Sequence, residues 1–155
     1  MAMAIGDSVL DSSLYIPELT TRSKDDTLAG LVTLAHRAGV VRDPQIVLDL
    51  LALREILGNT GIGKGVALPH ARSLSVKRPQ VVIARSRRGI DWDAPDGVPV
   101  TLVLLALTPG DWSEEAHHAL LAREAAVARL QRKRQRLLEA TSFADVAGVL
   151  GALAP

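Results

Sequence analysis

The residues best suited to chemistry lie between Asn59 and Arg72, in the run Asn-Thr-Gly-Ile-Gly-Lys-Gly-Val-Ala-Leu-Pro-His-Ala-Arg. Within it His70 follows Pro69, which has a fixed φ and favours an extended shape in the residue before it. A histidine on such a stiff segment can serve near neutral pH as a base, a nucleophile or a ligand. Arg72 could pair with an anion held nearby. The run therefore predicts a reactive site centred on His70.

Alternating glycines fill the first half of this run. They allow backbone conformations closed to other residues and can present N–H groups. Two nucleotide-binding patterns come close and fail. Gly58–Lys64 matches the first seven positions of a P-loop, but Gly65 stands where serine or threonine would hold Mg²⁺. In addition, a P-loop joins a strand to a following helix, whereas here a predicted helix precedes the loop and an extended segment follows it. The dinucleotide pattern G-x-G-x-x-G fails at Val66, so nucleotide binding is not the prediction.

A second group of candidates lies outside the run. His117 and His118 are neighbours on a predicted helix, where side chains diverge by about 100°, so only one can face a given site. Taken alone, they are best interpreted as solvated histidines. A zinc site using His70 and one of them is disfavoured, because no ligand spacing such as H-E-x-x-H is present. Arg54 falls seven residues after Val47 on an apolar helix stripe, and a charge there needs a partner or an exit to water. We favour a functional role for it, because this helix ends near the glycines.

Composition limits the remaining classes. The chain has 155 residues, 48% hydrophobic and 23% charged, which indicates one globular domain. It has no cysteine, so disulfides and thiolate chemistry are excluded. A net charge of +1 and 3% aromatic residues argue against nucleic acid. The basic run Arg129–Arg136 is interpreted as the solvent-exposed face of a helix, and a binding surface for RNA or another anionic partner is the less favoured alternative. Met1–Ile16 lacks a signal-peptide pattern and Val98–Leu107 is too short to span a bilayer, so we expect a cytoplasmic protein.

The elements expected to position these residues alternate between helix and strand. Two helices are expected in the first half, each after a capping residue, Ser23 or Asp43, and each ending at a glycine. Strands are expected at 81–84 and 98–107. The second is interpreted as a buried central strand, with a buried helix as the alternative that periodicity alone does not exclude. Interleaved helices and strands predict an α/β class. The apolar face of the second helix is expected to comprise Val47, Leu50, Leu51 and Leu57.

Three further features are expected beyond residue 84. Gly89 is expected to make a turn. One long helix is expected from about residue 114 to 139, and a short last helix opens at 142–145. The long helix is expected to bury Leu120, Val127, Leu130 and Leu137.

The stretch Arg54–Arg72 resembles the enzyme IIA domain of the bacterial phosphoenolpyruvate-dependent phosphotransferase system. It is similar to the fructose/mannitol class, which includes a nitrogen-regulatory branch. The hallmark of that family is an Arg-Glu pair, a Ser-Thr-Gly-Ile-Gly-like turn and then a Pro-His. The similarity extends to Gly89–Trp92, to Val100–Leu107 and to His117-x-x-Leu-Leu-Ala, and covers about residues 15–150.

The resemblance implies roles for particular residues. His70 matches the phosphoryl-accepting histidine, His117 the second active-site histidine, and Arg54 an arginine beside the phosphate. Further phosphate contacts are expected from Asn59, Thr60, Gly61, Gly63, Arg72 and His118. Neither a metal nor a cofactor is expected. The implied fold is a single domain over residues 1–155, with 1–14 as an extension and a mixed central β-sheet flanked by α-helices.

The resemblance also implies partners. The expected donor is HPr or its nitrogen-branch relative, and the expected acceptor in sugar uptake is a IIB domain. The alternative is a regulatory protein that signals by phosphorylation-dependent docking to other proteins. Three departures stand out. Asn59 replaces a serine, His118 replaces a leucine, and the long helix runs through Arg-Lys-Arg-Gln-Arg where the family often has a break near Asp-Pro.

Overall fold

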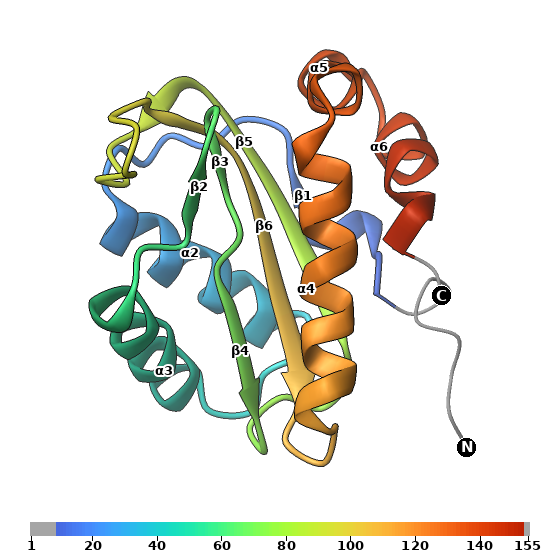
Figure 1. The fold of residues 1–155 in the computed structure, drawn as a ribbon. Helices are drawn as coiled ribbons and strands as arrows, with labels where there is room; N and C mark the ends of the chain where they lie inside the picture. Colours follow the sequence, from blue (N-terminus) through green and yellow to red (C-terminus); the bar gives the residue numbers. More distant parts are fainter. Residues whose placement is uncertain (1–8, 154–155) are drawn as a thin grey trace.

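A six-stranded mixed β-sheet forms the centre of the molecule in this computed structural model, which describes residues 9–153 (Figure 1). The strands are β1 (Tyr15–Ile16), β2 (Gly61–Gly63), β3 (Val66–Ala67), β4 (His70–Ser73), β5 (Gln80–Ile90) and β6 (Val100–Pro109). Their order across the sheet is β1, β5, β6, β3, β2, and β4 also pairs with β6. Strand β6 is antiparallel to β5 and parallel to β3 and β4, so the predicted mixed sheet and central strand are confirmed.

Strands β3 and β4 share one edge of β6. Val66 lies opposite Leu102, and His70 lies opposite Ala106. Between the two strands Pro69 has no N–H to donate, and its carbonyl accepts a hydrogen bond of 3.0 Å from the N–H of Ala106. The strand is therefore interrupted before His70, which becomes the first residue of β4.

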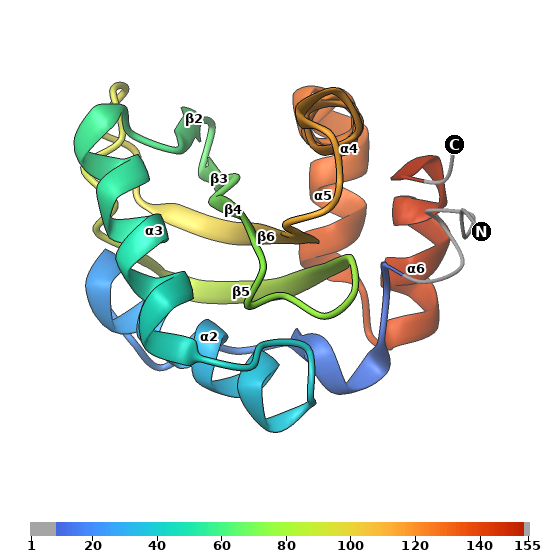
Figure 2. The same ribbon diagram turned by 90° about the horizontal axis from the view of Figure 1, so that it is seen from below.

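Helices cover both faces of the sheet, in two separate layers (Figure 2). They are α2 (Lys24–Arg37), α3 (Pro44–Leu57), α4 (Glu114–Arg129), α5 (Gln131–Glu139) and α6 (Phe143–Leu150). Helices α2 and α3 share one core with the sheet, and α4, α5 and α6 share the other. The predicted caps are confirmed, because Ser23 accepts from the N–H of Asp26 and Asp43 from that of Gln45.

The prediction of a single helix over residues 114–139 is wrong. At Leu130 the backbone is extended, with φ −89° and ψ 114°, and this residue separates α4 from α5. Leu130 is 50% exposed, whereas the other three leucine and valine positions of the expected face are buried. The side chain of Arg134 donates to the carbonyl of Ala128 at 2.7 Å, which satisfies an oxygen freed at the end of α4. The break near this point is therefore present without an Asp-Pro.

The prediction of a turn at Gly89 is also wrong. Strand β5 continues to Ile90, and its register with β6 shifts between Arg85 and Ile90, which makes an irregularity of the bulge type. Gly89 has φ +85°, and a Cβ there would lie 2.7 Å from the Cβ of Pro99. The glycine therefore permits the irregularity within a strand instead of ending it.

The predicted burial of α3 is only half right. Val47 and Leu51 are buried, but Leu50 is 38% and Leu57 75% exposed. The helix packs on the sheet through one narrow stripe and turns several large apolar side chains outward.

The beginning of the described chain packs on the sheet. Val9 and Leu14 are fully buried, and a short 3₁₀ turn, η1 (Ser12–Leu14), leads into β1. Tyr15 pairs in parallel with Ile83, so β1 forms one edge of the sheet. Of the extension expected at 1–14, residues 1–8 lie outside the described residues. No helix within residues 9–153 has the length and apolar character needed to cross a membrane.

Candidate functional site

Two histidine rings meet between β4 and α4. Nδ1 of His70 lies 3.0 Å from Nε2 of His117, and Nδ1 of His117 lies 2.7 Å from the hydroxyl oxygen of Thr108. His117 sits in the first turns of α4, whose start is fixed by the side chain of Ser113 accepting from a backbone N–H. His117 is 4% exposed, so its ring orientation depends on these bonds.

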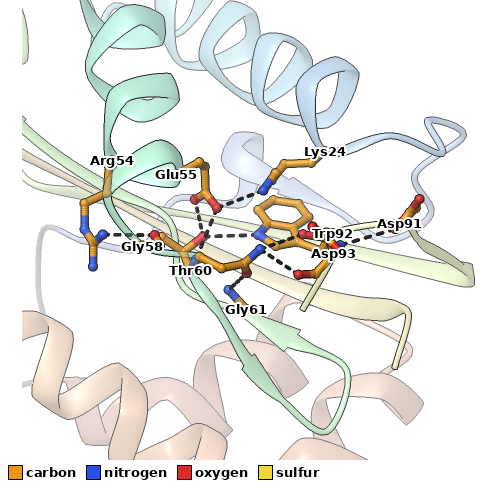
Figure 3. A network of polar contacts seen from close by, with 10 residues as sticks. Lys24, Arg54, Glu55, Gly58, Thr60, Gly61, Asp91, Trp92 and Asp93 are labelled. Carbon is orange, nitrogen blue, oxygen red and sulfur yellow. Dashed lines mark hydrogen bonds and ion pairs between the residues drawn. The ribbon is translucent and has the colours of Figure 1, made fainter. Parts of the chain in front are cut away.

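Arg54 reaches the same pair from the end of α3. Its Nε–H donates to Nε2 of His70 at 3.3 Å, and its Nη1 donates to the carbonyl of Gly58 at 3.0 Å. Figure 3 shows the guanidinium beside the Gly58 carbonyl, joined to it by a hydrogen bond, while the next side chain, Glu55, points away from it. The bond to Gly58 fixes the arginine at the helix end, so its charge faces the histidine.

The donors fix where the protons of the pair lie. A guanidinium can only donate, so Nε2 of a neutral His70 must carry the lone pair and Nδ1 the proton. That proton is donated to Nε2 of His117, whose own N–H then points from Nδ1 to Thr108. The chain of bonds selects one tautomer for each ring and directs the lone pair of His70 at Arg54.

The surroundings keep both rings uncharged. Burial, followed by the nearby His117, Arg54 and His118, lowers the pKa of His70 to about 4. Burial also lowers the pKa of His117 to about 4, with His118 and Arg72 acting in the same direction. At neutral pH each imidazole is therefore neutral and keeps an unprotonated nitrogen, as a nitrogen nucleophile requires.

Arg72 and His118 lie at the border of this site. Residues alternate along β4, so Arg72 points to the same sheet face as His70. It is exposed and donates to the carbonyl of Trp112 at 2.9 Å. His118 is exposed, with its ring centre 5.8 Å from that of His117. Of the two adjacent histidines, His117 is the one that contacts His70.

The glycine-rich segment is organised differently from the expectation. Asn59 donates to the carbonyls of Trp92 and Asp93 at 2.9 Å and accepts from the N–H of Gly61 at 2.7 Å. At the end of β2, Gly63 has φ +90°. The N–H of Gly61 is thus taken by a side chain instead of being presented to solvent.

Thr60 is 5% exposed and bonded to Glu55. The two hydrogen bonds of the His70 ring bring together Arg54, His70 and His117, and Arg72 and His118 lie nearby. The bonds of Asn59, Thr60 and Gly61 instead run to Glu55 and the loop after β5. Phosphate contacts from Asn59, Thr60, Gly61 and Gly63 stay predictions.

Two residues of the site were not singled out from the sequence. Thr108 is fully buried and fixes His117, and Glu55 binds the segment after α3. The available signal for Thr108 was a hydroxyl at the end of an otherwise apolar strand, where it needs a partner. Glu55 belongs to the Arg-Glu pair of the family hallmark, but the sequence alone indicates no role for it. Within residues 9–153, no group of three His, Cys, Asp or Glu side chains is arranged to hold a metal ion.

Comparison with known protein families identifies the class. The family "Phosphoenolpyruvate-dependent sugar phosphotransferase system, EIIA 2" matches residues 8–151. The chain therefore belongs to this family of phosphotransferase proteins.

Individual relatives differ in their assigned roles. The chain is 38% identical over 128 residues to a fructose-specific EIIA component of Haloferax volcanii, covering 83% of this chain and 82% of the relative. It is 34% identical over 125 residues to a fructose-specific EIIABC component of Bacillus subtilis, covering 80% of this chain but only 19% of that longer protein. Among solved structures, the nitrogen regulatory protein IIA-Ntr of Neisseria meningitidis aligns with a TM-score of 0.86 at 31% identity, covering 94% of this chain and 98% of that one.

Proposed function

We propose that the chain carries a phosphoryl group on Nε2 of His70. It accepts the group in the cytoplasm from a phosphorylated carrier protein of the HPr type and passes it to a IIB domain in sugar uptake. The observation that carries this proposal is the hydrogen bond from Arg54 to Nε2 of His70, because it identifies the nitrogen with the lone pair and puts a fixed positive charge beside it.

The transfer needs no group beyond these side chains. The lone pair on Nε2 attacks the phosphorus of the donor's phosphohistidine in line, a new N–P bond forms, and the donor's N–P bond breaks with its electron pair returning to the donor ring. Arg54 must leave Nε2 as the phosphorus arrives, and its N–H groups then bind the phosphoryl oxygens. Nδ1–H of His70 stays bonded to His117, which stabilises the positive charge on the phosphorylated ring.

An apolar surface beside the site suits docking of a protein donor. On α3, Ile46, Leu50, Leu53 and Leu57 follow one another at helical spacing and are 38–75% exposed. Ile56, in the same last turn as Arg54, is 81% exposed. Large apolar groups gathered on one helix are typical of an interaction surface. We define these five residues as the α3 surface and propose that the carrier proteins contact it.

A regulatory role is the second candidate. It is favoured by the similarity to IIA-Ntr of N. meningitidis over nearly the whole length of both chains. In that case His70 is phosphorylated in the same way, but the output is docking of the protein to a regulated target.

The test uses phosphoenolpyruvate, enzyme I and HPr with the purified chain. We expect a mass gain of one phosphoryl group that is lost in acid and that maps to the peptide containing His70. Uptake by a His70→Ala variant would overturn the site. Adding a fructose-type IIB protein then separates the two roles, because onward transfer to IIB supports sugar uptake and retention on His70 supports regulation.

A further inference from the structure

A buried polar cluster lies behind the end of α3 (Figure 3). The carboxylate of Glu55 accepts from Nζ of Lys24 at 3.2 Å and from the N–H of Thr60 at 3.1 Å. The hydroxyl of Thr60 contacts the same carboxylate, and the indole N–H of Trp92 lies 3.2 Å from that hydroxyl oxygen. The side chain of Glu55 is 8% exposed, so water competes little for these bonds.

The direction of each bond follows from the donors. An indole N–H can only donate, so the oxygen of Thr60 accepts from Trp92, and its single proton goes to Glu55. The backbone N–H of Thr60 is bonded to Glu55 as well. Both the hydroxyl and the backbone N–H of Thr60 are thus engaged within the protein in this structure, which points to a structural role for this residue.

Thr60 joins the two segments that carry the reacting pair. On one side it binds Glu55, which adjoins Arg54 in the last turn of α3. On the other side its carbonyl accepts from the N–H of Leu68 at 3.0 Å, two residues before His70. A continuous path of short bonds thus runs from the end of α3 to the start of β4.

We propose that Glu55, acting through Thr60, is a positioning residue that holds the guanidinium of Arg54 against Nε2 of His70; this inference rests on the function proposed above. This role does not require either residue to touch the phosphoryl group. The distance of 3.3 Å between Arg54 and His70 depends on where the end of α3 lies relative to β4, and the path through Thr60 sets that placement. Because misplacing a reacting group by about 1 Å can cost about 100-fold in rate, loosening this path slows transfer without removing a reacting atom.

The test compares three variants. Thr60→Val removes the hydroxyl and keeps the shape, and Thr60→Ser keeps the hydroxyl. Thr33→Val is the matched control, because the hydroxyl of Thr33 only donates to the carbonyl of Ala29 within α2, at 2.8 Å on the exposed surface. Two quantities are measured: the rate of phosphoryl uptake from phosphorylated HPr, and the pKa of His70 in the unphosphorylated protein by NMR titration of its ring.

We expect Thr60→Val to slow uptake by about 10- to 100-fold. It also raises the pKa of His70 toward the value in an Arg54→Gln variant, because the guanidinium withdraws while His117 and His118 on α4 stay in place. Thr60→Ser restores most of both quantities and Thr33→Val changes neither. In an Arg54→Gln background, Thr60→Val has no further effect.

Two results would overturn the positioning role. One is a Thr60→Val protein with the uptake rate and His70 pKa of the wild type; the other is an equal slowing in the Arg54→Gln background. If the backbone NMR spectrum shows that Thr60→Val is unfolded, Glu55→Gln carries the same comparison. Absence of uptake by the wild type would overturn the proposed function alone, and the pKa comparison would still decide the positioning role.

Discussion

Replacing Thr108 by valine removes one hydroxyl from beneath the histidine pair and leaves the shape of the side chain nearly unchanged. In the structure that hydroxyl lies 2.7 Å from Nδ1 of His117, and Thr108 is 0% and His117 4% exposed. The substitution therefore leaves a buried imidazole N–H without a partner, which costs about 1–3 kcal/mol of unfolding free energy. For a domain of this size each kcal/mol lowers Tm by about 2–4 °C.

The same substitution acts on the tautomer of His117. Without Thr108, its ring is free to carry the proton on Nε2, which would then oppose the N–H of His70 across the 3.0 Å contact. We expect both changes in the variant, measured by urea unfolding and by long-range ¹H–¹⁵N spectra of the rings. Thr108→Ser, which keeps the hydroxyl, is the control. A Thr108→Val protein with unchanged stability and an unchanged His117 tautomer would refute the proton assignment.

Three other predictions concern pH, the core and docking. Burial lowers the pKa of His70 and His117 to about 4, so the rate of phosphoryl uptake should be constant from pH 8 to 6 and fall below about pH 5. The free energy of unfolding should decline from pH 6.5 toward 4, because in this range the unfolded chain binds protons that the folded protein does not. An uptake rate that halves near pH 6.5 would contradict this prediction. Glu124 is fully buried, neither of its oxygens has a partner among the described residues, and burial raises its pKa above the ordinary value of 4.5. Glu124→Met should therefore stabilise the protein by about 1–3 kcal/mol at pH 7.5 and by less at pH 4.5, where the carboxyl of the unfolded chain is itself about half protonated; equal gains in urea unfolding at both pH values would contradict it. Leu53 is 52% exposed on the α3 surface, so Leu53→Glu should leave Tm unchanged. The variant should nevertheless have a KM for phosphorylated HPr that is about tenfold higher, and an unchanged KM would exclude this surface from docking.

Much of the local structure could be predicted because the signals are local. Ser23 and Asp43 cap helices in the structure as their sequence context indicates, and Val100–Pro109 is a buried strand. The match of Arg54, His70 and His117 to family positions also predicted three side chains that the fold brings into contact.

The predictions that were wrong concern features that depend on packing between distant segments. The run around Leu130 consists of good helix formers, so propensity gives no reason for a break. In the structure the chain turns at Leu130, and α5 packs against α4 and α6 with Leu137 buried. Gly89 has the φ of a turn residue, yet neighbouring strands keep it inside β5. Whether Leu57 is buried cannot be read from an apolar pattern when the helix presents apolar residues on two sides.

The bonds of the site are equally non-local. Thr108 and His117 are close in sequence, but only the packing of α4 on β6 turns the ring toward the hydroxyl. Trp92 reaches Thr60 from a loop that lies far along the chain. The sequence pointed to the side chains that meet at the site, whereas the residues that hold them in place became visible only in the structure.

The most direct test of the account is ¹⁵N–³¹P coupling in the phosphorylated, ¹⁵N-labelled protein. We predict one phosphoryl group, bonded to Nε2 of His70, with Nδ1 still protonated. A phosphoryl group on Nδ1 of His70, or on either histidine of α4, would contradict the central claim.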